Sequence, residues 1–121
     1  MLKPFSFTKM DRIRKSSKYR ILSTYGIRHY NEYFVIVSRK NQFLRSRLGI
    51  TVSKKVGKAV TRNRIKRIIR EYFRVNRSML PVQLDINVIA RQPSAKIGNE
   101  SLRENLGCLL HTISQKKHPA V

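Results

Sequence analysis

The chain has 121 residues, with 27 Lys or Arg against six Asp or Glu and a formal net charge of +21. This length suits a single domain with a modest core, and an apolar content of 40% excludes the composition of a disordered chain. A positive excess of this size opposes compact folding unless a polyanion neutralises it, and nucleic acid is the leading candidate. We expect one nucleic-acid-binding domain over residues 1–121.

Neither a membrane nor an oxidising compartment is expected for this chain. No apolar run approaches the roughly 18 residues that a membrane span needs, and residues 1–15 lack the apolar segment of a signal peptide. Cys108 is the single cysteine, so it forms no intramolecular disulfide, which suits a reducing cytoplasm. Glycine-rich nucleotide-binding loops are absent from the sequence. We predict a cytoplasmic protein with no membrane partner and no small-molecule substrate.

The N-terminal part is predicted to be an arm followed by a short helix. Residues 1–11 show no sustained hydrophobic period and are expected to be flexible. A helix is predicted over 16–26. Ser16 or Ser17 can cap its start, and Gly26 can end it in the left-handed conformation.

Three strands are predicted from runs of β-branched and aromatic residues, at 32–38, 47–53 and 85–91. The polar segment 39–46 between the first two is predicted to be a turn with room for one more short strand. Gly49, inside the second strand, permits close approach of another backbone or of a ligand.

The C-terminal part is predicted to be a helix over 99–114, because its leucines recur at helical spacing. Pro81 marks the loop before the third strand, and residues 115–121 are expected to form a flexible tail. With a basic helix between the second and third strands, the order is α-β-β-α-β-α. This order predicts an α+β sandwich of a small sheet and helices.

The basic helix lies within residues 54–74, where nine of 21 positions are Lys or Arg and Glu71 is the only acid. A helix is predicted from about 59 to 74, and its period of 3.6 residues separates apolar from cationic side chains. The apolar side consists of Ile65, Ile68, Ile69, Tyr72 and Phe73. This side is predicted to dock on the sheet.

The cationic side of the same helix is predicted to bind phosphates. Solvated helix surfaces usually alternate opposite charges at i,i+4, because such pairs add stability. Here Arg62, Lys66 and Arg70 repeat one sign at that spacing, and arginine binds phosphate bidentately. Lysines before the helix surround Gly57, where backbone N–H groups favour an anion. The predicted binding residues are Lys54, Lys55, Lys58, Arg62, Asn63, Arg64, Lys66, Arg67 and Arg70.

Catalytic and metal-binding residues are not expected in the protein. A protein nuclease needs clustered carboxylates or a positioned histidine. The acids outside the basic helix, Asp11, Glu32, Asp85, Glu100 and Glu104, are scattered along the sequence, and the three histidines lie in no motif.

Residues 51–71, TVSKKVGKAVTRNRIKRIIRE, resemble the signature of the protein component of bacterial ribonuclease P. The centre of the match is the pattern R-N-R-x-K-R-x-x-R-E, and the resemblance extends over roughly residues 12–113. It implies the αβββαβα two-layer sandwich of that family, in the class of the second domain of ribosomal protein S5. That fold has a small mixed sheet and a left-handed βαβ crossover. Because right-handed crossovers are the general rule, this handedness is expected from the resemblance alone.

The resemblance also implies a function. Members of the family assist a catalytic RNA that removes the 5′ leader of precursor tRNA, and the RNA performs the hydrolysis with Mg²⁺. The chain is therefore expected to be the protein subunit of a ribonucleoprotein endoribonuclease, with the catalytic RNA and precursor tRNA as partners. No cofactor is expected on the protein alone, and the predicted phosphate-binding residues become RNA contacts.

In the family, a cleft between the first helix and the sheet holds the single-stranded leader. Tyr19 falls where relatives carry an aromatic that lines the cleft, and the odd-numbered face of the first strand is expected to floor it. Ser23 stands where some relatives carry a second aromatic, so a two-ring stacking platform is expected only where Tyr33, Tyr25 or another ring takes its place. The predicted cleft residues are Tyr19, Tyr33, Val35 and Val37.

A structural ribosomal RNA-binding protein is the alternative function, because it would share the size, the charge and the basic helix. The Arg-Asn-Arg block that follows Lys-Lys-Val-Gly-Lys favours ribonuclease P instead. A helix-turn-helix repressor needs a core of three helices, which the predicted strands oppose.

Overall fold

The computed structural model of the chain describes residues 9–80, 82–116 and 118. Its strands are β1 (Ile27–Tyr30), β2 (Phe34–Lys40), β3 (Arg47–Thr51) and β4 (Leu84–Ala90). Its α-helices are α1 (Ser16–Tyr25), α2 (Ala59–Asn76) and α3 (Asn99–Ser114). Short 3-10 turns lie at η1 (Lys9–Asp11), η2 (Lys54–Val56), η3 (Arg77–Met79) and η4 (Gln92–Lys96).

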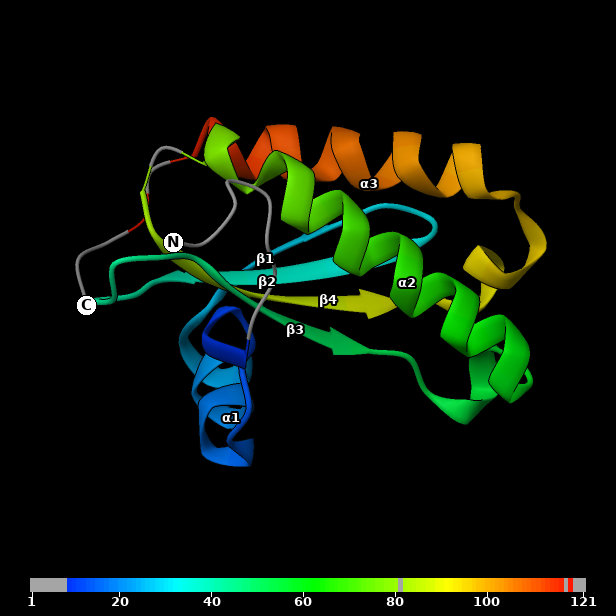
Figure 1. Cartoon of the computed structure of the whole chain (residues 1–121), viewed down its shortest axis with the longest axis horizontal. Coiled ribbons are helices and arrows are strands. Elements are labelled where there is room, and N and C mark those ends of the chain that lie inside the picture. The colour runs from blue at the N-terminus through cyan, green and yellow to red at the C-terminus, as the bar shows by residue number, and fades with distance from the viewer. Residues whose placement is uncertain (1–8, 81, 117, 119–121) are drawn as a thin grey trace.

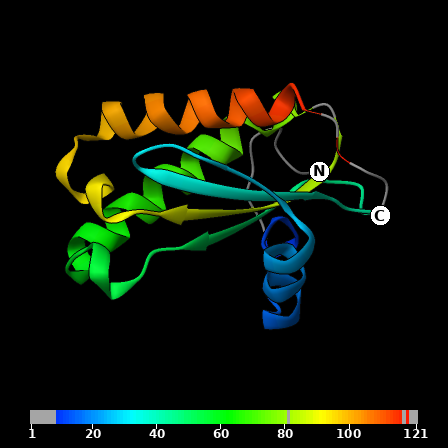
Figure 2. The same ribbon diagram turned by 180° about the vertical axis from the view of Figure 1, so that it is seen from behind.

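The four strands form one mixed sheet in the order β1-β2-β4-β3. β2 pairs antiparallel with β1 and β4, whereas β3 runs parallel to β4. Helices α2 and α3 lie along one face of this sheet, and α1 lies on the other face at one end (Figures 1 and 2). The predicted α+β fold with the order αβββαβα is confirmed.

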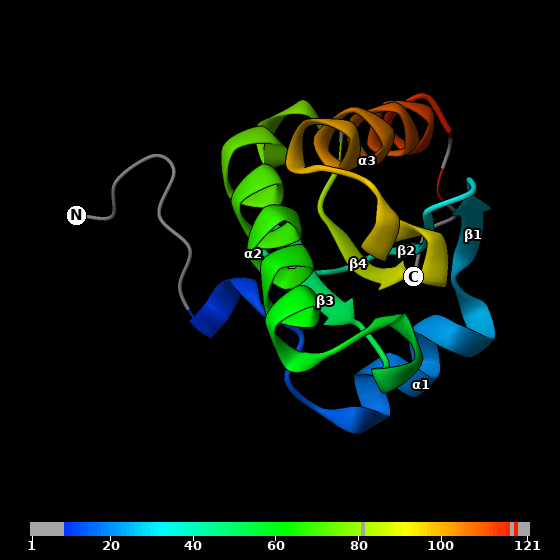
Figure 3. The same ribbon diagram turned by 90° about the vertical axis from the view of Figure 1, so that its right-hand side faces the viewer.

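The connection from β3 through α2 to β4 is a left-handed crossover. In Figure 3 both strands run toward the viewer, the helices lie above the sheet, and β4 lies to the right of β3. Viewed from the helices with the strands pointing up, β4 therefore lies to the left of β3, against the general rule. This arrangement packs α2 against β3, which is an edge strand of the sheet.

The main core fills the space between the sheet and the layer of α2 and α3. Alternation along β2 and β4 directs Phe34, Ile36, Ile86 and Val88 into this space, and each is at most 2% exposed. The buried side of α3 consists of Leu102, Leu106, Leu109, Leu110 and Ile113. The predicted helix over 99–114 therefore has both its bounds and its packing confirmed.

A smaller cluster of Ile13, Leu22 and Val37 attaches α1 to the opposite face of the sheet. Gly26 lies where the helix meets the sheet, and the left-handed conformation predicted for it is wrong. Its backbone is extended, with φ −75° and ψ 159°. A Cβ at Gly26 would lie 2.5 Å from both Val37 Cγ1 and the Leu22 carbonyl oxygen, so glycine is required there by close packing.

Three local predictions in the first half of the chain are also wrong. The additional strand lies at β1 rather than within 39–46, and its four residues carry Arg28 and His29, which hid it from a hydrophobicity pattern. The helix α1 begins with Lys15 at its N-cap position, and no side chain caps it. β2 begins two residues later than predicted, because the Asn31 side-chain oxygen accepts hydrogen bonds from the backbone N–H groups of Tyr33 and Phe34 in a turn.

Parts of the predicted flexible ends, and Pro81, lie outside the described residues. At the N-terminal end, residues 9–11 of the predicted arm form η1, and Asp11 is fully buried there. Across the described ranges, none of the helices combines the length and the apolar character needed to cross a membrane.

Candidate nucleic-acid interface

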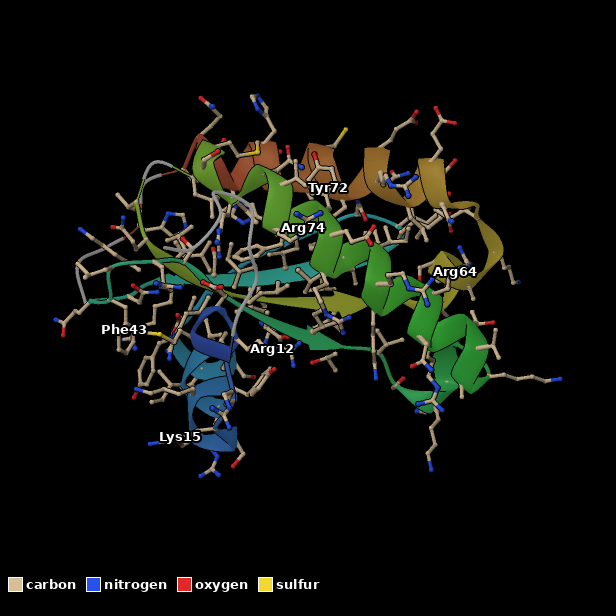
Figure 4. The ribbon with its side chains drawn as sticks, viewed as in Figure 1. Arg12, Lys15, Phe43, Arg64, Tyr72 and Arg74 are labelled. Atoms are coloured by element: carbon tan, nitrogen blue, oxygen red, sulfur yellow. The ribbon has the colours of Figure 1, made fainter. Side chains whose placement is uncertain are left out.

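The helix α2 has one buried and one exposed side, as its period predicts. Ile65, Ile68, Ile69 and Phe73 are at most 4% exposed and belong to the main core. Tyr72 is half-buried between α2 and α3 (Figure 4), and burial raises its pKa above the ordinary value. This side fixes the rotation of α2 on the sheet, and with it the direction of the cations.

The cations of α2 lie outside the core. Asn63 and Arg67 are exposed, whereas Arg62, Lys66 and Arg70 are half-buried. The ion pairs recorded between described residues involve none of Lys66, Arg67 and Arg70. The three lysines that precede the helix, Lys54, Lys55 and Lys58, are also exposed. Acidic side chains of the described chain therefore leave this positive face uncompensated, which is the condition for binding an external anion.

Two arginines of this face are held by hydrogen bonds within the protein. Arg62 Nε donates to the Gly57 carbonyl oxygen at 3.1 Å, which ties α2 to the turn before it. Arg64 Nη1 donates to the side-chain oxygen of Asn99 at 2.7 Å. Arg64 therefore reaches the first residue of α3, on the side of the molecule away from α1 (Figure 4).

A groove of about 180 Å³ joins α1 to α2 across the edge strand β3. We call it the α1–α2 groove, and its lining consists of Arg12, Ile13, Tyr19, Leu48, Ile50, Lys66 and Arg70. The backbone of Ile13 donates to the Leu48 carbonyl oxygen at 2.9 Å, so the segment before α1 extends the sheet at this edge. The groove brings one predicted cleft residue, Tyr19, together with two predicted phosphate-binding residues, Lys66 and Arg70.

Tyr19 lies directly over Gly49 of β3. A Cβ at Gly49 would come within 2.6 Å of the Tyr19 ring, so the group that approaches this glycine closely is a side chain and not the backbone or ligand that was predicted. The Tyr19 hydroxyl donates to the Ile13 carbonyl oxygen at 3.2 Å. Burial raises the pKa of Tyr19, and a hydrogen bond from the Ile50 backbone opposes that shift. The ring is thus a neutral, fixed side chain with one face on the sheet.

The other predicted cleft residues differ in their surroundings. The odd-numbered face of β2 points toward α1, as expected, with Val35 half-buried and Val37 only 1% exposed. Val37 therefore packs in the cluster beneath α1 and exposes little area to a ligand. Tyr33 packs against the main core and not against the cluster beneath α1.

Two residues of β1 that the sequence did not single out lie on this same sheet face. Tyr30 pairs with Val35 and is 73% exposed. Arg28 pairs with Val37, and its Nη2 donates to both the Oγ and the carbonyl oxygen of Ser23 at 3.2 Å. A guanidinium therefore contacts Ser23, and an exposed ring lies on the same sheet face. Recognising β1 as a strand would have placed both residues on this face, but the hydrophobicity pattern of the sequence did not predict that strand.

Within the residues that the structure describes, no three His, Cys, Asp or Glu side chains lie close enough together to hold a metal ion. Glu71, the only acid of the basic segment, is exposed. What the interface offers chemically is cationic, aromatic and hydrogen-bonding surface.

Comparisons with known proteins give one consistent result. The family model described as Ribonuclease P matches residues 7–114. The chain is 46% identical over 111 residues to the ribonuclease P protein component of Desulfatibacillum aliphaticivorans, covering 92% of this chain and 94% of that protein. Among solved structures, it is similar to the ribonuclease P protein of Staphylococcus aureus (TM-score 0.81, 38% identity, 85% and 94% coverage). It is also similar to that of Thermotoga maritima (TM-score 0.76, 36% identity, 88% and 97% coverage).

Proposed function

The chain belongs to the ribonuclease P protein family, and from this membership we propose that it binds the catalytic RNA through α2 and the 5′ leader of precursor tRNA beside α1. The family is the protein part of an endoribonuclease of tRNA processing, which decides against the alternative of a structural ribosomal protein. In the proposed complex the protein supplies binding and orientation, and the RNA performs the hydrolysis.

The α1–α2 groove is the observation that carries this proposal. Lys66 and Arg70 present charge on one wall, and Tyr19 presents a ring on the other. Cations bind the phosphate backbone without regard to sequence, and an aromatic ring stacks an unpaired base. One continuous surface can therefore contact a folded RNA at α2 and a single strand at α1.

Mg²⁺, which the family implies, fits the RNA better than the protein. Mg²⁺ prefers oxygen ligands and usually takes one or two carboxylates together with phosphates. No acidic side chain of the described chain lines the α1–α2 groove. We therefore assign to the protein the neutralisation of phosphates around the site, and to the RNA the ligands of the metal.

Reconstitution tests the proposed function. Purified protein added to the catalytic RNA of its own source should increase the rate of leader removal from precursor tRNA, most strongly at low Mg²⁺. The physical reason is that protein cations replace part of the counterions that the RNA otherwise requires. A rate that does not respond to the protein at any Mg²⁺ concentration would contradict the proposal.

Replacing Tyr19 by Ala is expected to weaken binding of leader-bearing precursor tRNA by about 1–3 kcal/mol, the usual contribution of one stacked base. Mature tRNA should bind with unchanged affinity. Gly49→Ala is the complementary variant, because its Cβ displaces the ring without removing it. It should reproduce the direction of the Tyr19→Ala effect. Binding of both substrates to the reconstituted complex gives the measurement.

Thr24→Ala is the control on the same helix, because Thr24 is exposed and does not line the groove. It should leave both affinities unchanged. Equal weakening of precursor and mature tRNA by Tyr19→Ala would remove this ring from the leader site.

A further inference from the structure

An exposed aromatic ring lies in the loop between β2 and β3, at the opposite end of the molecule from Arg64 (Figure 4). Phe43 is 49% exposed, and it does not line the α1–α2 groove. The sequence predicts only a polar turn here. A half-exposed ring normally costs free energy in water, because its apolar surface remains hydrated. The residues around Phe43 therefore indicate which kind of partner would bury the ring.

The Phe43 ring rests on a charged support. The guanidinium carbon of Arg47 lies 4.1 Å from the ring centroid. Arg47 is itself fixed by Asp85, through Nε to Oδ1 at 2.9 Å and Nη2 to Oδ2 at 2.6 Å. This bidentate bond also raises the pKa of Arg47 above its ordinary value. We call the stack of Phe43, Arg47 and Asp85 the Phe43 platform.

The loop that carries the ring is equally constrained. The Asn41 side-chain oxygen accepts the Phe43 backbone N–H at 2.9 Å, which forms an Asx turn. Asn41 Nδ2 donates to Asp85 Oδ1 at 2.8 Å and to the Arg45 carbonyl oxygen at 3.2 Å. The same carboxylate thus fixes both the loop and the arginine beneath the ring. Phe43 is exposed but not free to turn away, so little entropy is lost when something stacks on it.

The space around the platform is strongly positive. An open groove of about 750 Å³ extends from Phe43 and Arg47 toward the start of α1. Its other lining residues are Met10, Arg12, Arg14, Lys15 and Lys18. Arg14 and Lys15 are exposed. Among the residues that the structure describes, no acid lines this groove. A second groove that Phe43 lines, between α1 and the loop, adds Arg39 and Lys40. Among the described residues, its only acid is the Asp85 already bound to Arg47.

A protein partner suits this surface less well than RNA does. Interface cores on protein surfaces are depleted in charge, whereas here cations line both of the grooves that the ring borders. Leu44, 98% exposed, and Met10, 67% exposed, add apolar area, but this area is continuous with the arginines and lysines. An unpaired nucleotide offers both a flat apolar face and a phosphate, which are the two features that the surface complements.

We propose that the Phe43 platform is a base-stacking site for an unpaired nucleotide of RNA, separate from the α1–α2 groove. The base covers the ring face opposite Arg47, and the flanking phosphates contact Arg14, Lys15 and Lys18. The inference rests on the proposed function for the identity of the polyanion as RNA. The nucleotide belongs either to the catalytic RNA or to the leader. Binding titrations with each of these two RNAs distinguish the two sources.

The first test uses Phe43→Ala in two titrations of the protein. In one, the catalytic RNA alone is titrated; in the other, the reconstituted complex is titrated with leader-bearing or mature tRNA. Loss of one stacked base should weaken the affected titration by about 5- to 150-fold. Weakening with the RNA alone identifies the catalytic RNA as the source. Weakening only with leader-bearing substrate identifies the leader.

The second test uses fluorescence and does not depend on truncating the ring. The chain contains no Trp, so Phe43→Trp introduces a single reporter. Binding of the RNA identified above should quench this emission by stacking. Leu44→Trp, at the neighbouring exposed position, is the matched control and should be quenched much less. Thermal unfolding of each variant verifies that the fold is retained.

The outcomes separate this inference from the proposed function. If the wild-type protein stimulates leader removal but Phe43→Ala binds every RNA normally and Phe43→Trp is not quenched, the platform proposal is overturned and the proposed function stands. If Phe43→Ala instead changes only the sedimentation mass of the protein, the surface is a protein interface and the proposal is again overturned. Failure of the wild-type protein to bind RNA would overturn both.

Discussion

Asp11→Ala is expected to lower the free energy of unfolding by about 3–5 kcal/mol, the cost of removing one partner from a buried ion pair. The Asp11 side chain is fully buried, and its Oδ1 lies 2.9 Å from Arg45 Nη1 and 2.7 Å from Arg77 Nη1. The Arg45 contact is also a hydrogen bond, and Arg77 forms a second ion pair with the same oxygen. Urea unfolding followed by circular dichroism gives the measurement.

Glu104→Ala is the control for this prediction. It removes the same charge from an exposed position of α3 and should change stability by less than about 0.5 kcal/mol. In a chain of net charge +21, loss of any acid increases the repulsion between cations. The control measures how much this change in net charge alone destabilises the protein. Equal destabilisation by the two substitutions would show that Asp11 contributes only through net charge.

The predicted effect of Asp11 links stability to the candidate interface. Asp11 joins η1 to the β2–β3 loop through Arg45 and to η3 through Arg77. The next residues, Arg12 and Ile13, form one wall of the α1–α2 groove. One buried carboxylate therefore fixes three segments that are distant in sequence, at the edge where RNA is proposed to bind.

The sequence could predict α2 in detail because one physical rule governs it. The helical period assigns each of its side chains to the core or to the surface, and the structure agrees for Ile65, Ile69 and Phe73. The same holds for α3. Strand β1 escaped prediction because four residues with two polar side chains carry too little pattern. Pairing with β2 stabilises β1, and pairing is a tertiary property.

The α1–α2 groove and the Phe43 platform could not be derived from the sequence pattern. The groove depends on a left-handed crossover, which general topology rules would have assigned to the other hand. The platform depends on Asp85, 44 residues from Asn41 and 38 from Arg47. In retrospect, two weak signals were present. Asn41 stands two residues before an isolated aromatic, and acids are so rare in this chain that each is a candidate for a structural ion pair.

The double variant Arg67→Ala with Arg70→Ala is expected to weaken binding of the catalytic RNA by about 3 kcal/mol, or roughly 150-fold, if each arginine makes one charged hydrogen bond to phosphate. Both side chains lie outside the core, so stability should change little. The salt dependence is the more specific measurement. Each lost phosphate contact should reduce the slope of log K against log salt by about 0.7–0.9, giving a total of about 1.5.

Lys96→Ala with Arg103→Ala separates local contact from general attraction in this experiment. Both positions are exposed, lie in η4 and α3, and line neither the α1–α2 groove nor the Phe43 platform. The control lowers the net charge by the same two units. If RNA binding depended only on the total charge of the protein, the two double variants would weaken it equally and with the same slope. A larger loss for Arg67 and Arg70 would mean that the ordered cations of α2, held in position by its buried side, contact phosphates directly.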